Sequence, residues 1–118
     1  MADTFEVYFK RQMLQQTLGV GTPTLALYTD DGATELTETG YSRQPLAVTV
    51  TVTEPILARN NADVTFGPAV GDWPTLTHVG IFDDAGELLC KKVLTTPVAP
   101  LNSETFEIIA NALEVGFV

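Results

Sequence analysis

Cysteine, histidine and basic residues are scarce in this chain of 118 residues, and each shortage excludes a class of function. The single cysteine, Cys90, excludes an internal disulfide and any metal site built from several cysteines. The single histidine, His78, is the only imidazole available to a nucleophilic triad, and no Gly-x-Ser-x-Gly motif accompanies it. We therefore predict that the protein is not an enzyme and holds no cofactor and no metal.

Positive charge is also in short supply, because six basic residues stand against fifteen acidic ones and the formal net charge is -9. Most of the surface would repel a phosphate backbone, so nucleic acid is not an expected partner. No apolar run approaches the roughly 20 residues that span a bilayer, and Asp3 and Glu6 interrupt any signal-peptide pattern. We expect a soluble protein that is made in the cytosol and has no membrane partner.

The N-terminal segment predicts one α-helix over about residues 4–18, which Asp3 or Thr4 caps and Gly19 ends. A helical wheel places its apolar residues on two nearly opposite arcs. One arc holds Phe5, Tyr8, Phe9 and Met13, and the other holds Val7, Leu14 and Leu18. A helix that only lay on its own sheet would need one such face. The second face therefore meets either a neighbouring subunit or another groove of the same fold.

The rest of the chain, about residues 23–118, reads as short strands between Gly, Pro, Asn and Asp turns. The clearest strand is 46–53, which alternates apolar residues with Ala and Thr and should be half-buried. Further strands are expected at 24–29, 56–59, 62–66, 75–82, 87–94, 105–110 and 113–118. The pattern predicts a single all-β domain over 1–118, an antiparallel β-sandwich of the jelly-roll or a related Greek-key type, with one N-terminal helix.

Acidic and asparagine pairs mark the expected turns. "DDG" at 30–32 and "DDAGE" at 83–87 have carboxylates and a glycine, yet neither has the spacing of a calcium loop, so hairpin turns are favoured. Asn60-Asn61 is expected to turn the chain into the next strand.

The only tryptophan and the only histidine lie close together in the sequence. Trp73 precedes Pro74 and anchors either the core of the chain or a contact between subunits. His78 shares a strand face with Leu76, Gly80 and Phe82, which indicates a partly buried ring more than a catalytic base.

Three stretches carry a resemblance to a known family. They are "GYSRQPLAVT" (Gly40–Thr49), "ADVTFGPAVGDWPTLTHVGIFDDAGELL" (Ala62–Leu89) and "LTTPVAPLNSETFEI" (Leu94–Ile108). Together they resemble a family of small virion proteins of tailed bacteriophages, whose members are variously labelled tail-fibre proteins or capsid decoration proteins. "FGPA" in place of a Phe-Pro pair and Leu76 in place of valine depart from the family pattern and affect local turn geometry.

The resemblance implies a virion structural protein that is assembled in the host cytoplasm. It favours a capsid decoration (cement) protein, a homotrimer that binds the major capsid protein on the outside of the shell, because the sequence has no shaft-like repeat. The alternative is a tail-fibre or tail-tip adhesion protein that contacts other tail proteins and whose loops, such as 30–39 or 60–63, reach a cell surface. Subunit or shell contacts are expected at Phe5, Phe9, Met13, Leu14, Tyr41, Arg43 and Trp73.

Overall fold

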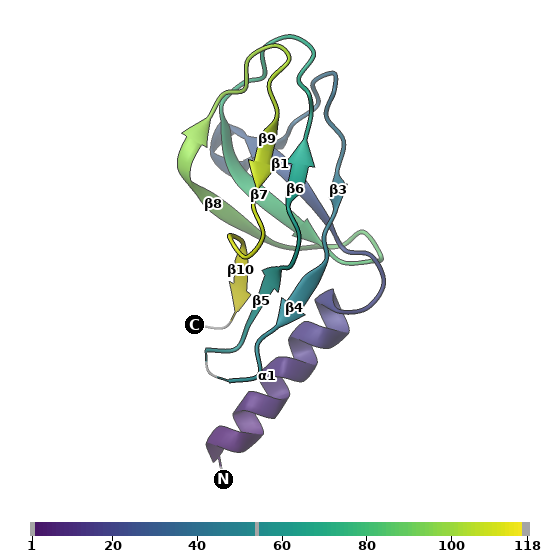
Figure 1. Cartoon of the computed structure of the whole chain (residues 1–118), viewed down its shortest axis with the longest axis vertical. Coiled ribbons are helices and arrows are strands. Elements are labelled where there is room, and N and C mark those ends of the chain that lie inside the picture. Colours follow the sequence, from purple (N-terminus) through teal and green to yellow (C-terminus); the bar gives the residue numbers. More distant parts are fainter. Residues whose placement is uncertain (1, 54, 117–118) are drawn as a thin grey trace.

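The computed structural model describes the backbone of residues 2–53 and 55–116, and the side chains of this part from residue 8 onward. It contains an N-terminal helix, one short 3-10 turn and ten strands (Figure 1). The elements are α1 (Ala2–Leu18), β1 (Thr24–Thr29), η1 (Asp30–Gly32), β2 (Thr34–Glu35), β3 (Gln44–Pro45), β4 (Val48–Val50), β5 (Leu57–Asn60), β6 (Val64–Phe66), β7 (Leu76–Phe82), β8 (Leu88–Val98), β9 (Phe106–Ile108) and β10 (Glu114–Gly116).

The strands form antiparallel sheets in two layers. One layer is a sheet with the order β2-β1-β7-β8, with β3 also paired to β1. The other layer consists of a three-stranded sheet, β10-β5-β4, and the pair β6-β9. Every strand pairing described is antiparallel. The prediction of an all-β antiparallel sandwich with one N-terminal helix is confirmed.

The core lies between the two layers, where alternate residues of each strand point inward. β1 and β7 supply Leu25, Leu27, Val79 and Ile81, all at most 1% exposed. The second layer contributes core residues from β5, β6 and β9. They include Ala58, Val64, Phe66 and Ile108, and they belong to the same apolar cluster as the residues of β1 and β7.

The predicted strand 46–53 is wrong in its extent. The chain first pairs with β1 through Gln44–Pro45, and only Val48–Val50 then pairs with β5 in the opposite layer. Leu46 lies at the crossing point, 3% exposed, and its N–H donates to the Pro23 carbonyl at 2.8 Å. Val52, expected to be buried, is 68% exposed. A strand that passes from one sheet to the other cannot keep one face on the core throughout, and this breaks the simple alternation.

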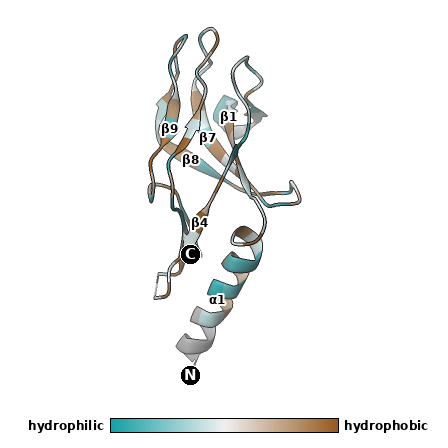
Figure 2. Ribbon diagram, turned by 45° about the vertical axis from the view of Figure 1, so that its right-hand side comes forward, coloured by the Kyte–Doolittle hydropathy of each residue, from teal (hydrophilic) through white to brown (hydrophobic). Residues whose placement is uncertain are grey.

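The helix is confirmed, and it begins two residues earlier than predicted. It ends at Leu18 as expected, where the Gly19 N–H donates to the Gln15 carbonyl at 3.0 Å. Its C-terminal half packs on the sandwich through Leu14 and Leu18, while its N-terminal half projects beyond the strands (Figures 1 and 2). The molecule is therefore elongated, with extents of 55 × 26 × 23 Å.

Both acidic turns are turns, as predicted. Residues 83–87 join β7 to β8, and the Asp83 carboxylate accepts the N–H groups of Ala85 and Glu87 at 3.0 and 2.9 Å. Asp30 and Asp31 have left-handed backbone angles in η1, a conformation that aspartate tolerates better than most residues.

Asn60 has a larger role than the predicted turn. It ends β5, is only 1% exposed, and its side chain makes three hydrogen bonds to the segment between β9 and β10 and to its own turn. The amide nitrogen donates to the carbonyls of Ile109 (2.8 Å) and Ala62 (3.0 Å), and the amide oxygen accepts the Leu113 N–H (2.9 Å). One buried amide thus fixes the chain that leads into β10.

Candidate functional site

The end of the molecule opposite α1 is built from three loops, residues 36–43, 67–75 and 99–105, which we call the distal loops (Figure 1). Hydrogen bonds join the middle loop, 67–75, to each of the other two. The Thr39 carbonyl accepts the Val70 N–H at 3.2 Å, and the Ala69 N–H donates to the Glu104 carbonyl at 2.8 Å. The Asn102 side chain accepts the Gly71 N–H at 2.8 Å. The distal loops therefore form one connected platform.

Close backbone approach also holds these loops together. Gly40 has φ of +92°, and a Cβ there would collide with the Pro68 carbonyl of the neighbouring loop. Only glycine allows both the left-handed backbone and the contact. Asp72 adds a further tie, because its carboxylate accepts the Asn102 N–H at 2.9 Å.

Trp73 anchors the distal loops to the core. Its side chain is 2% exposed, its ring meets that of Tyr41 edge-on at 6.3 Å, and its indole N–H donates to the Thr39 carbonyl at 3.1 Å. Trp73 therefore lies as an anchor within its own chain, one of the two roles expected for it, and a subunit contact at Trp73 stays a prediction.

Tyr41 and Arg43 form a polar cluster with Glu35 beside β1. The Tyr41 hydroxyl donates to Glu35 at 2.6 Å, and the Arg43 guanidinium binds both oxygens of the same carboxylate at 2.8 and 3.0 Å. Arg43 also lies over the Phe82 ring, 3.9 Å from its centre. The bidentate hydrogen bond from Arg43 holds the pKa of Glu35 below its ordinary value. Burial, together with the hydrogen bond to Glu35, raises the pKa of Tyr41.

These contacts give Tyr41 and Arg43 a role inside the chain. They fasten the segment between β2 and β3 to β1, where the Leu27 N–H donates to the Tyr41 hydroxyl at 3.1 Å. About two fifths of the Arg43 side chain stays exposed, so its contact with another subunit remains a prediction.

The two predicted arcs of α1 have different surroundings. Leu14 is 7% exposed and packs on the sandwich, and its expected contact with another subunit stays a prediction. Phe9 and Met13, on the opposite side, are 57% and 43% exposed, and Tyr8 beside them is 59% exposed. Phe5 belongs to the same arc by sequence, and its side chain lies outside the described residues.

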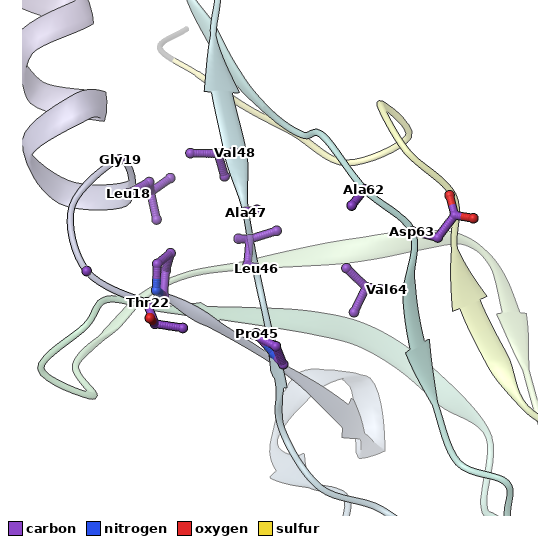
Figure 3. Close-up of a pocket in the computed structure, with 12 residues that line it drawn as sticks. Leu18, Gly19, Thr22, Pro45, Leu46, Ala47, Val48, Ala62, Asp63 and Val64 are labelled. Carbon is purple, nitrogen blue, oxygen red and sulfur yellow. The ribbon is translucent and has the colours of Figure 1, made fainter.

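A groove of about 470 Å³ lies where α1 ends and the chain crosses between the layers (Figure 3). Most of its lining side chains are apolar, among them Leu18, Pro45 and Val48, and its polar side chains are Thr22 and Asp63. The Asp63 carboxylate already accepts the Ala110 N–H at 2.8 Å. A small-molecule site needs several convergent polar groups, and this groove provides few.

His78 and Cys90 are placed as structural residues. The His78 ring is partly buried, with Nδ1 3.0 Å from the Thr77 hydroxyl and the ring against Gly32. Cys90 is half-buried, and burial raises the pKa of its thiol, which opposes a nucleophilic role. Within the described part of the chain, no three His, Cys, Asp or Glu residues gather as metal ligands. No described helix has the length and apolar character needed to cross a bilayer.

Comparison with known families identifies the protein family of this chain. A family model described as "Podophage GP4 fiber I protein gp80" matches residues 9–116, which covers all the strands and most of α1. The chain belongs to this family. A search of the curated proteins found no match. As a member of the gp80 family, the protein is a structural component of a phage virion, and the predicted membership of a tailed-phage virion family is confirmed.

The stretches that carried the resemblance lie partly in the distal loops. "GYSR" (40–43) lies in the loop 36–43. "FGPAVGDWP" (66–74) makes up most of the loop 67–75, and "PLNSET" (100–105) makes up most of the loop 99–105. Sequence reasoning missed the side chains that join them, such as Asn102 and Asp72, because their partners lie some 30 residues away in the chain. In the sequence, the Asn-Ser pair at 102–103 and the Gly-Asp pair at 71–72 indicate turns and nothing about their partners.

Proposed function

We propose that this member of the gp80 family is a structural part of the phage fibre apparatus, attached through α1 and carrying the distal loops at its free end. The family description names a fiber protein, which supports this placement. The observation that carries the proposal is the polarity of the elongated molecule, whose two ends have different construction.

The helix end is suited to attachment. α1 has three large apolar side chains that are 43–59% exposed, Tyr8, Phe9 and Met13, and Met13 lies at the rim of the groove between α1 and the sandwich. Exposed large apolar side chains that gather on one face mark a surface for another protein. Repetition around a symmetric assembly strengthens modest contacts of this kind.

The distal end is suited to display. Its loops hold their shape through hydrogen bonds among Thr39, Val70, Glu104 and their neighbours, and through the buried Trp73. A platform of this kind can meet a partner without first becoming ordered, which lowers the entropy cost of contact. Nothing in the described clusters resembles a nucleophile activated by a base, so the proposed role is mechanical and adhesive, not catalytic.

The test is a count of copies in purified particles by quantitative mass spectrometry, combined with antibody labelling under the electron microscope. The proposal expects a handful of copies per particle and label at the tail. Hundreds of copies with label over the head would overturn it.

A second candidate is a capsid decoration protein, favoured by one observation. The described part of the chain is one compact sandwich without a shaft-like repeat, and a unit of this kind can work by multiplicity on a symmetric shell. On this candidate the count is in the hundreds. Particles that lack the protein would then lose heat resistance and keep normal adsorption.

A further inference from the structure

The strand β8 is the last strand of its sheet, and no described strand pairs with its outer edge. It has 11 residues and runs along the left side of the molecule in Figure 1. The free edge of a sheet presents backbone N–H and C=O groups that an extended segment of another chain can bind. The outer edge of β8 is therefore a candidate surface for an added strand.

Hydrogen bonds at the far side of β1 show which way the backbone groups of this sheet point. The Leu27 N–H donates to the Tyr41 hydroxyl at 3.1 Å, and the Leu27 carbonyl accepts the Leu36 N–H at 2.8 Å. Both backbone groups of Leu27 therefore point away from β7. Successive pairs of an antiparallel ladder alternate in direction, so Val79, which lies opposite Leu27 on β7, directs its groups toward β8.

The same alternation continues into β8, where the register is continuous over residues 90–93. Lys92 lies opposite Val79, so its backbone groups point toward β7. The N–H and C=O groups of Lys91 and Val93, on either side of it, point outward. Among the hydrogen bonds of the described residues, none uses these outward groups. The edge thus offers two donors and two acceptors to an added strand.

A groove of about 370 Å³ lies along this edge. It is lined by residues 92–95 of β8 and by apolar side chains that include Ile108, Ala112 and Leu113. Consecutive residues of a strand point to opposite faces, so a groove that touches all of 92–95 follows the edge itself. Side chains of an added strand could enter it. Lys92 is the one charged residue among the described residues that line it.

The edge is basic although the chain is strongly acidic. β8 contains Lys91 and Lys92 and no acidic residue, whereas the formal net charge of the chain is -9. The Lys91 ammonium donates to the Gly32 carbonyl at 2.7 Å, and the Lys92 ammonium donates to the Glu114 carbonyl. Neither ammonium belongs to an ion pair described in the structure. Because neighbouring residues of a strand point to opposite faces, one cation flanks the edge on each face.

We propose that the outer edge of β8 binds an extended acidic segment of another protein, which adds one strand to the sheet. The outward backbone groups select a strand, since a helix bonds its own backbone groups and offers none to an edge. The two lysines select acidic side chains, because opposite charges on facing strands attract. This site goes beyond the proposed fibre role and does not depend on it.

A second copy of β8 is a poor occupant of this edge. It would add two more lysines to the ladder and no carboxylate to neutralise them. Lysines on a free edge discourage unspecific pairing of strands, and an acidic strand is the partner that turns this repulsion into attraction.

The test is amide hydrogen exchange of the full chain, followed by NMR, with the synthetic peptide TVVEEVT capped at both ends. Its two glutamates can face Lys91 and Lys92, and its other residues favour an extended strand. At a peptide concentration of about ten times the dissociation constant, roughly one molecule in eleven stays free. Exchange of the Lys91 and Val93 N–H groups should then slow about tenfold. The Lys92 N–H, which points toward β7, should exchange slowly with and without the peptide.

Charge is tested by a second peptide and by variants of the chain. TVVKKVT should bind more weakly than TVVEEVT, although the chain as a whole is acidic. Lys91→Gln and Lys92→Gln should each weaken TVVEEVT binding about 1.5- to 5-fold, as expected for one cross-strand charge pair. The matched control is Arg11→Gln, which removes a cation that donates to the Thr51 carbonyl near the other layer, and it should leave binding unchanged.

The backbone ladder is tested by N-methylated peptides. Alternate amides of a strand point to the same edge, so methylation of one alternate set in TVVEEVT should abolish binding, and methylation of the other set should preserve it. Three results would overturn the proposal: no slowing at Lys91 and Val93 up to about 10 mM peptide, binding of TVVKKVT as tight as that of TVVEEVT, or equal effects of the two methylated sets. The particle count tests the fibre placement separately, so the two failures are distinguishable.

Discussion

Replacing Asn60 with alanine should destabilise the protein far more than replacing its neighbour Asn61. Asn60→Ala removes three hydrogen bonds and leaves the Leu113 N–H and the Ile109 carbonyl without the partners they have now. An unsatisfied buried backbone group costs about 1–3 kcal/mol, and the Ala62 carbonyl beside the exposed turn can turn to water at little cost. We expect a loss of about 3–5 kcal/mol in the free energy of unfolding, a large part of the total for a domain of this size.

Asn61→Ala is the matched control. That side chain is exposed and donates only to the Thr49 hydroxyl, at 3.2 Å, so its loss should stay within about 0.5 kcal/mol. Urea unfolding followed by fluorescence of Trp73 gives both values, and thermal melting should show a drop of roughly 10–20 °C for Asn60→Ala alone. Equal effects of the two substitutions, or a loss below about 1 kcal/mol for Asn60→Ala, would refute the assignment of Asn60 as the residue that fixes the chain before β10.

Three further predictions concern other parts of the fold. Trp73→Phe keeps an aromatic ring and removes the bond to the Thr39 carbonyl, so stability should fall by about 1–2 kcal/mol in urea titrations; an unchanged midpoint would remove the anchoring role. Because Arg43 lowers the pKa of Glu35 in the folded state, the ionised carboxylate adds stability above its unfolded pKa of about 4.5, and this contribution is lost as the pH falls below it. Glu35→Gln should therefore show a smaller drop in urea midpoint than the native protein between about pH 7 and pH 3.5, and parallel pH curves would contradict this. Gly80→Ala would push a methyl group into a tyrosine ring of β1, and it should lower stability by about 1–3 kcal/mol in thermal melts, whereas no loss would show that the ring moves aside freely.

Most strand and helix positions could be predicted from the sequence, because each depends on local periodicity. β1 agrees with the prediction in both bounds, and the hairpin between β7 and β8 lies at the predicted acidic turn. The failure at 46–53 has a definite cause. Alternation shows which residues can share a face, but it carries no information on which sheet pairs with each half of a strand.

The candidate contact surfaces could be predicted from the sequence only in part. The helical wheel correctly separated two apolar arcs on α1, yet it could not tell which arc the sandwich would cover, since both are apolar. The sequence left two roles for Trp73, in the core or at an interface, for a similar reason. The burial of its side chain depends on loops that come from distant parts of the chain. The structural role of Asn60 could not be predicted at all, since a buried asparagine and a turn asparagine look the same in sequence.

The crossing of Gln44–Val50 from one sheet to the other has a mechanical consequence. This stretch is bonded to β1 in one layer and to β5 in the other, so neither layer can peel away without rupturing hydrogen bonds in its counterpart. A load applied across the molecule is shared by both sheets at once. Such a part should resist strain as a unit and give way in a single event, without delamination.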